Sequence, residues 1–319
     1  MADPEFVEVP FAVPAGTGKV RLDVFLAGRL RGYSRAKVQS MIEEERVLLG
    51  RRSAKPAAKV FDGDTVVIRF PWRPDPESGH GRLEVLHQDD DVLAVNKPGD
   101  LLSHPTDKTT KASATWILGR QIPGFKPYLI HRLDRETSGI LLFGRNQRAA
   151  RRLSEQFESR EVRKEYWALV RGAFRGARVV DRPIGRAGHA IRVRQSVSES
   201  GQSARTLFSC LVPGRKVSLV SAKPRTGRLH QIRVHLAWLG HPVVGDKLYT
   251  GEGEAYVKAW KGELSEEDAA LLGAGRQMLH ARSLEFRQPT TGVRVRLTAP
   301  LPPDFKAVMA SFGLREPAV

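Results

Sequence analysis

Cysteine is nearly absent from this sequence, with Cys210 the single example among 319 residues. One thiol forms no internal disulfide and supplies too few ligands for a cysteine-based zinc site, and a reducing compartment is its natural setting. The chain also lacks any apolar run of about 18 residues, the length that a membrane-spanning helix needs. Its first residues carry acids where a signal peptide needs positive charge, so we expect a soluble, cytoplasmic protein with no membrane partner.

Acidic residues are the next shortage. The chain has 35 Asp and Glu against 52 Lys and Arg, a formal net charge of +17, and a pI near 10.4. Such an excess of positive charge favours a polyanionic partner, and nucleic acid is the first candidate because basic proteins release counterions from phosphate backbones. Charge alone leaves open a protein that is merely basic.

The length of 319 residues predicts more than one domain, because typical single domains have roughly 100–150 residues. Residues 71–82 are rich in proline and glycine and have no apolar period, which indicates a linker. We therefore predict a small domain at residues 18–70 and a larger domain at residues 83–319.

The small domain shows the pattern of an α+β unit. Apolar residues recur at helical spacing over residues 22–30, and Ser34 is a suitable N-cap for a second helix over residues 35–42. Residues 47–49 and 66–68 are typical of strands, and the Asp-Gly-Asp of residues 62–64 predicts a turn.

Three short motifs make this unit resemble the S4 RNA-binding domain. They are Arg-Leu-Asp at residues 21–23, Ser-Arg-Ala-Lys-Val-Gln at residues 34–39, and the Asp-Gly-Asp turn. The resemblance implies that basic side chains on paired helices hold phosphates and position the protein without reading sequence. The alternative is a solvated charged face. The candidate RNA-binding residues are Arg31, Arg35, Lys37, Arg51 and Arg52.

The larger domain carries strand-like runs at residues 85–86, 92–95, 140–143, 166–170 and 217–220. One helix is expected after Asn146, and another carries Leu229, Ile232, Leu236 and Leu239 and ends at Gly240. Strands and helices do not alternate strictly. The pattern favours an α+β fold with a central mixed or antiparallel sheet flanked by helices.

A polar loop, His-Arg-Leu-Asp-Arg-Glu-Thr-Ser-Gly at residues 131–139, precedes one of these strands. Loops that rest on rigid strands commonly carry catalytic residues. The carboxylate of Asp134 lies between Arg132 and Arg135, whose positive charges favour its ionised form and make it a candidate nucleophile. A turn stabilised by surface ion pairs is the alternative.

The loop resembles the signature of the RluA family of pseudouridine synthases, His-Arg-Leu-Asp-Arg-x-Thr-Ser-Gly, at every fixed position. Further blocks at residues 96–99, 164–166, 226–235, 240–246 and 279–281 resemble the same family in the same order. The resemblance implies the pseudouridine synthase fold and the isomerisation of uridine to pseudouridine in RNA. It implies no cofactor and no metal ion.

The resemblance also implies roles for single residues. Asp134 is the catalytic aspartate, which attacks the ribose or removes a ribose proton. Tyr166 lies against the uracil and helps to remove the C5 proton, unless it is only a core tyrosine. Arg233 pairs with Asp134, with Arg228 as the competing candidate. Arg132 fills the gap that the extruded nucleotide leaves, or else binds backbone phosphate.

His131, Arg135, Arg228 and His230 complete the predicted substrate-binding set. We expect hydrogen-bonding roles for His230 and His235, whose spacing is wrong for two metal ligands on one helical face. The segment Thr226-Gly227 is predicted to begin a helix and to offer free backbone N–H groups to an anion. One departure from the family pattern is Leu229, which stands where a threonine is usual; another is Arg287-Gln288-Pro289, where His-Pro is usual.

An S4-like unit before an RluA-type domain resembles enzymes that act on large-subunit (23S) ribosomal RNA, and a monomer is the default. Three alternatives are a tRNA pseudouridine synthase, a catalytically silent RNA-binding factor of ribosome assembly, and a glycoside hydrolase that uses Asp134 and Glu136. The hydrolase needs two carboxylates that flank a sugar bond, which two positions so close in sequence do not assure.

Overall fold

The computed structural model describes residues 6–30, 33–50, 52–71, 79–106, 109, 111–188 and 191–317. The chain divides into two compact units, residues 1–74 and 75–319. The division falls within residues 71–82, of which residues 72–78 lie outside the described ranges. The sequence placed the start of the first domain at residue 18, and the first compact unit also includes residues 6–17. Strand β1 (Phe6–Ala12) pairs along its whole length with β6 (Thr65–Pro71) and is part of this unit.

The first unit packs two helices on a small antiparallel sheet. The helices are α1 (Leu22–Ala27) and α2 (Arg35–Glu43), and the sheet has the strand order β1-β6-β3-β4. The core contains apolar side chains from the helices and from the sheet. Ser34 caps α2 as predicted, because its hydroxyl accepts a bond from the Lys37 amide. The remaining strands are β2 (Val20–Arg21), β3 (Val47–Leu49), β4 (Arg52–Ser53) and β5 (Lys59–Val60).

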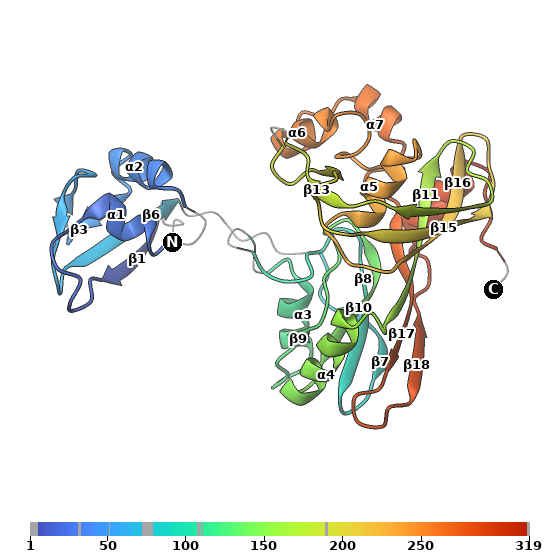
Figure 1. Ribbon diagram of the computed structural model, residues 1–319, viewed down its shortest axis with the longest axis horizontal. Helices are drawn as coiled ribbons and strands as arrows, with labels where there is room; N and C mark the ends of the chain where they lie inside the picture. The colour runs from blue at the N-terminus through green and yellow to red at the C-terminus, as the bar shows by residue number, and fades with distance from the viewer. Residues whose placement is uncertain are drawn as a thin grey trace. The chain divides into compact units, whose positions relative to one another are not determined.

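The second unit is built on one large mixed sheet with the strand order β12-β15-β16-β11-β17-β10-β8-β7 (Figure 1). Strands β10 and β17 run parallel, while the other neighbours along this order are antiparallel. The α+β class predicted from the sequence is confirmed. The bounds are β7 (Glu84–Gln88), β8 (Val92–Lys97), β10 (Ser138–Gly144), β11 (Arg163–Arg171), β12 (Ala177–Asp181), β15 (Arg205–Val212), β16 (Val217–Pro224) and β17 (Leu279–Arg287).

Shorter strands and helices complete this unit. Strand β18 (Arg294–Thr298) pairs with β17, β9 (Tyr128–Leu129) pairs with β10, and β13 (Ile184–Arg186) pairs with β14 (Gln195–Val197). Helices α3 and α4 lie beside the β7–β10 half of the sheet (Figure 1). The helices are α3 (Ala114–Gln121), α4 (Gln147–Glu158), α5 (Gln231–Trp238), α6 (Glu254–Lys261), α7 (Glu266–Leu272) and α8 (Pro303–Ser311).

Strands β8 and β10 are buried on both faces. Successive side chains of a strand point to opposite sides, so each strand feeds two separate cores. One core contains Val92, Ala94, Ile140 and Leu142 with Leu153 of α4, and the other contains Leu93, Val95, Leu141 and Phe143 with Ile117 and Leu118 of α3. The loop that precedes β10 therefore rests on a strand that is fixed from both sides.

Gly139, the second residue of β10, gives a first test of this fold. Its φ is +106°, and a Cβ at this position would overlap the backbone carbonyl of Ala281 on β17. We expect Gly139→Ala to lower the free energy of unfolding by roughly 2–4 kcal/mol, measured by urea denaturation.

Gly119→Ala is the matched control. Gly119 lies inside α3, where a Cβ meets no atom within 4 Å, so alanine should stabilise the helix by up to about 1 kcal/mol. Equal effects of the two substitutions would contradict the packing described for β10 and β17.

Candidate active site

The loop at residues 131–137 is held in place by buried polar groups. The hydroxyl of Ser103 accepts a bond from the Leu133 amide and donates one to the Leu133 carbonyl, both at 2.9 Å. The amide of Thr137 donates to the Asp134 carbonyl at 3.0 Å, and the Gln277 amide group donates to the Thr137 hydroxyl at 2.8 Å. The backbone on both sides of Asp134 is therefore fixed before any substrate binds.

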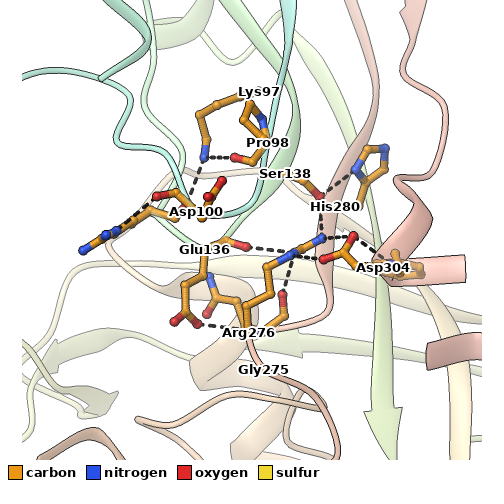
Figure 2. Close-up of polar contacts among 12 residues, drawn as sticks. Lys97, Pro98, Asp100, Glu136, Ser138, Gly275, Arg276, His280 and Asp304 are labelled. Carbon is orange, nitrogen blue, oxygen red and sulfur yellow. Dashed lines mark hydrogen bonds and ion pairs between the residues drawn. The ribbon is translucent and has the colours of Figure 1, made fainter. Parts of the chain in front are cut away.

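Lys97 ties a second segment to this loop. Its side chain is fully buried, and its ammonium donates to the carbonyls of Pro98 and Leu101 at 2.7 Å and of Arg135 at 3.0 Å (Figure 2). Burial lowers the pKa of Lys97 to about 7. Three carbonyls use the three donors of the ammonium, so Lys97 serves to join residues 97–101 to the loop.

Arg276 supports the other end of the loop (Figure 2). It forms a two-point ion pair with Asp304 of α8, at 2.6 and 3.0 Å, and donates to the Glu136 carbonyl at 2.9 Å. The Glu136 carboxylate accepts hydrogen bonds from Lys247 Nζ at 2.7 Å and from the backbone amide of Gln277 at 3.1 Å. Glu136 is therefore bound within the supporting network.

Asp134 is the first member of a row of three charged groups. Arg233 Nη1 donates to Asp134 at 2.8 Å, and the other edge of the guanidinium, Nε and Nη2, binds Asp246 at 2.7 and 2.9 Å. Asp246 is fully buried and also accepts the amides of Leu248 and Tyr249. A charge-assisted pair of this geometry fixes the direction of a guanidinium.

These neighbours keep Asp134 ionised. Burial on its own raises the pKa of the Asp134 carboxyl, but the charge of Arg233 and the bonds from Arg233 and Gln277 outweigh this effect. The pKa consequently lies below its ordinary value. At neutral pH the group is a carboxylate that is 23% exposed, open to a ligand on one side and neutralised on the other.

Tyr249 and His230 brace Arg233. The guanidinium lies 5.0 Å from the centre of the Tyr249 ring, a cation–π distance. The Tyr249 hydroxyl accepts the Gln195 amide at 3.0 Å and shares a 2.9 Å hydrogen bond with His230 Nδ1. Burial lowers the pKa of His230 to about 4, so its ring is neutral. His230 and His235, which bonds to Thr206 at 2.9 Å, are hydrogen-bonding histidines as predicted.

A pocket opens in front of Asp134, and β11 supplies its aromatic wall. Burial raises the pKa of the Tyr166 phenol, and the charge of Asp134 raises it further, so the phenol is protonated. We call the pocket in front of Asp134 the inner pocket. A second pocket, the outer pocket, adjoins it and shares Arg132 and Lys164 with it. The polar residues of the inner pocket are Arg132, Asp134, Thr137, Lys164, Tyr166, Thr226, Arg228, His230, Gln231 and Arg233.

Two of the predicted substrate-binding residues, His131 and Arg135, bind neighbouring parts of the chain. His131 Nε2 accepts the Leu142 amide at 3.2 Å, and its ring stacks on Phe157 at 5.0 Å. Arg135 is exposed and donates to the Asp100 carbonyl at 3.2 Å. His131 borders the outer pocket only, whereas Arg132, Arg228 and His230 line the inner one.

The helix predicted to begin at Thr226-Gly227 was placed too early. Helix α5 begins at Gln231 with His230 as its N-cap, and Leu229, expected to face inward, is 44% exposed. The Gln231 side chain accepts the Arg228 amide at 3.0 Å and the Thr226 hydroxyl at 2.7 Å. The Arg228 amide is therefore not available to an anion, and the helix N-terminus lies at residues 230–231 instead of 226–227. Arg228 itself donates to the Ser203 carbonyl and does not pair with Asp134.

The basic residues predicted in the first unit have different environments. Arg35 binds the buried carboxylate of Asp23 through Nε and Nη2 at 3.1 and 3.0 Å. Lys37 and Arg52 are exposed. Arg31 and Arg51 lie outside the described residues.

Known proteins are similar in sequence to this chain over nearly its whole length. Residues 91–238 match the RNA pseudouridylate synthase family. Ribosomal large subunit pseudouridine synthase D of Xylella fastidiosa is 34% identical over 310 residues, which cover 95% of this chain and 92% of that protein. The chain belongs to the pseudouridine synthase family. It is an RNA pseudouridine synthase, an isomerase.

Other proteins that are similar to this synthase carry related names. The protein of the same name from Vibrio cholerae is 31% identical over 305 residues, with 93% of this chain and 92% of that protein covered. The solved structure of human RNA pseudouridylate synthase domain containing 1 is 32% identical, with a TM-score of 0.58 over 73% of this chain and 90% of that chain. The solved structure of human RNA pseudouridylate synthase domain containing 4 is 28% identical, with a TM-score of 0.59 over 74% of this chain and 95% of that chain.

Among the helices of the described residues, none combines the length and the apolar composition needed to cross a bilayer.

Replacing Arg233 in this synthase should move the pH dependence of the reaction. In Arg233→Gln the carboxylate of Asp134 loses its cation, so its pKa rises and the acid limb of the rate–pH profile shifts to higher pH. We expect uridine conversion at neutral pH to fall at least about 100-fold, since Asp246 also loses its partner.

Arg228→Gln is the control for this change. Arg228 lines the same pocket, but its recorded partner is the Ser203 carbonyl. Its acid limb should stay where the wild type has it. An Arg233→Gln enzyme with an unshifted acid limb would disprove the proposed effect on Asp134.

Three histidines with lowered pKa values should make the stability of the second unit depend on pH. Burial lowers the pKa of His131 to about 3 and the pKa of His230 and His280 to about 4, whereas an unfolded histidine titrates near about 6.5. Between these values the unfolded chain binds more protons. Stability is therefore complete above about pH 6.5 and falls as the pH falls, by up to about 1.4 kcal/mol per pH unit for each histidine.

Urea unfolding at a series of pH values from neutral to mildly acidic measures this slope. His280→Gln should make the slope shallower, because one of the three groups is gone. A wild-type stability that does not change over this range would show that the three rings are not held neutral by the fold.

Proposed function

We propose that this synthase converts specific uridines of large-subunit (23S) ribosomal RNA to pseudouridine, with Asp134 as the nucleophile. The observation that carries the proposal is the Asp134 carboxylate, held at 2.8 Å by Arg233 in a pocket that Tyr166 also lines. The choice of RNA is supported by relatives named ribosomal large subunit pseudouridine synthase D, which align over almost the entire chain.

Asp134 is suited to the first step because it is ionised and fixed in direction. It attacks the ribose or removes a ribose proton, and the glycosidic bond breaks in either route. The uracil then turns in the pocket and rejoins the sugar through C5, as the bond from Asp134 to the ribose breaks or the ribose proton returns, and the C5 proton is lost to solvent. Arg233 touches Asp134 on one edge only, so the free face of the carboxylate remains available to the sugar.

Tyr166 contributes its ring face. A uracil that enters the pocket has this aromatic side chain on β11 to stack against, and such stacking contributes roughly 1–3 kcal/mol per base. Its phenol has a raised pKa, so the resting enzyme holds a phenol and not a phenolate. We therefore assign Tyr166 primarily to holding the base, and secondarily to contact with the C5 proton as it leaves.

The target nucleotide must leave its stack to reach Asp134, at a cost of a few kcal/mol. Arg132 is exposed on the loop and borders both pockets. We assign it to the gap left in the RNA, where a planar cation stacks on bases and donates hydrogen bonds.

The first unit is proposed to be an S4-like RNA-binding domain. Its pair of short helices presents Lys37, which is exposed on α2, while Arg35 beside it is half exposed and shared with Asp23. Exposed cations of this kind add affinity for phosphates without base specificity.

The glycoside hydrolase alternative loses its second carboxylate. Glu136 is bonded to Lys247 and to the Gln277 amide and does not line the pocket of Asp134. The silent assembly factor and the tRNA enzyme are separated from the proposal by experiment.

The test is tritium release from large-subunit rRNA labelled at uridine C5. We expect release by the wild type and none by Asp134→Asn, because an amide neither attacks the ribose nor removes a ribose proton. Glu136→Gln is the matched control and should retain release, since this carboxylate supports the loop from behind.

Unfolding curves for each variant show whether the fold is kept. Release from bulk tRNA but not from rRNA would replace the proposed substrate by tRNA. Wild-type enzyme that binds RNA and releases no tritium from either would identify a silent assembly factor.

A further inference from the structure

The outer pocket, which lies beside the uridine pocket, is lined by five cations and one acid. Within the described residues none of the five forms an ion pair with a carboxylate. Surface cations on this chain commonly do so, as Arg194 with Glu252 and Lys258 with Asp268 illustrate. A concave group of five cations that holds one acid and no ion pair is suited to an anionic ligand. The five are Arg132, Arg160, Lys164, Arg225 and Arg228, and the acid is Glu158.

Lys164 stands out among these residues. It is half-buried, and burial lowers its pKa. Its ammonium lies 5.6 Å from the centre of the Phe157 ring. Lys97, which is fully buried, has three carbonyls that satisfy its ammonium. In the described part of the chain no such acceptor meets the ammonium of Lys164, which lines the pocket and is therefore open to an acceptor that a ligand supplies.

The position of Lys164 relates it to the base. Lys164 and Tyr166 are two residues apart on β11, so their side chains leave the same face of the strand. Both line both pockets. Across the pocket, a Cβ built on Gly227 would lie 3.9 Å from Lys164 Nζ. An anion bound to Lys164 is therefore adjacent to a base that stacks on Tyr166.

Arg160 occupies a backbone conformation that favours glycine. It follows the end of α4 with φ +62°, where helices commonly end in glycine because a side chain is strained there. An arginine at this position places a charge on the rim of the outer pocket at a cost in stability. That combination is typical of a functional residue.

We propose that the outer pocket is a subsite for the backbone phosphate joined to the target uridine, with Lys164 as its inner ligand and Arg160 and Arg225 at its rim. The inference rests on the proposed function and adds to it. Asp134, Arg233 and Tyr166 act on the sugar and the base, whereas this subsite would hold the flipped nucleotide by its phosphate. Phosphate contacts set position and carry no sequence information.

The experiment removes the charge of the RNA phosphate and, separately, the charge of Lys164. An RNA hairpin with a uridine that the wild type converts is made with normal linkages, or with one neutral methylphosphonate on the 5′ or the 3′ side of that uridine. Affinity and single-turnover conversion are measured for the wild type and for Lys164→Met, whose side chain still packs on Phe157.

We expect the methylphosphonate at one of the two linkages to weaken wild-type binding by roughly 10- to 100-fold, the range for a hydrogen bond between charged groups. Lys164→Met should show a similar loss on normal RNA and no further loss at that linkage. A Lys164→Met enzyme that binds normal RNA like the wild type would overturn the subsite. So would a full further loss at both linkages in the variant.

Two more variants separate charge from folding. Arg160→Gly removes a rim cation and relieves its backbone, so RNA affinity should fall while the melting temperature stays equal or rises. Lys261→Met removes an exposed lysine of α6 and should change neither. A wild type that converts no uridine in any RNA would overturn the proposed function itself, which is a different outcome from an active enzyme that is indifferent to Lys164.

Discussion

The chain of charges from Asp134 through Arg233 to Asp246 is the interaction on which the rest of the site depends. A carboxylate that is largely buried would ordinarily take up a proton, and Arg233 prevents this. Arg233 is itself a buried cation, and it is tolerated because Asp246 and the Tyr249 ring hold its other edge and its face. Such a row is stable only when every member is present. Asp134, which is 23% exposed, lies at the end of this row that faces the pocket.

The sequence predicted much of this arrangement where the signal was local. The loop at residues 131–139, the strand that follows it and the Asn146 cap of α4 all lie within one short segment, and the structure has them where they were expected. The pairing of Arg233 with Asp134 was also expected, although from family resemblance and not from spacing.

The supporting residues were not predicted, for a physical reason. Lys97 and Asp246 lie in blocks that resemble the family and Gln277 lies in none, but no local pattern assigned any of the three a role. They act only because the sheet brings distant segments together. No periodicity reports such contacts. The start of α5 was misplaced because Leu229 has helical spacing to Ile232, whereas the Gln231 side chain binds the Arg228 amide and delays the helix. Strand β1 was not predicted either, because its pairing with β6 joins segments that lie far apart in the sequence.

The ion pair of Arg276 with Asp304 gives the order in which the site becomes complete. Arg276 supports the catalytic loop by way of the Glu136 carbonyl, and Asp304, on α8, fixes Arg276 from the far end of the sequence (Figure 2). During synthesis the loop is made well before α8 leaves the ribosome. Until α8 is made, the loop lacks an Arg276 that Asp304 holds in place, although Ser103 and Lys97, which precede the loop in the sequence, already have their partners in it. The last support of the loop therefore arrives with α8.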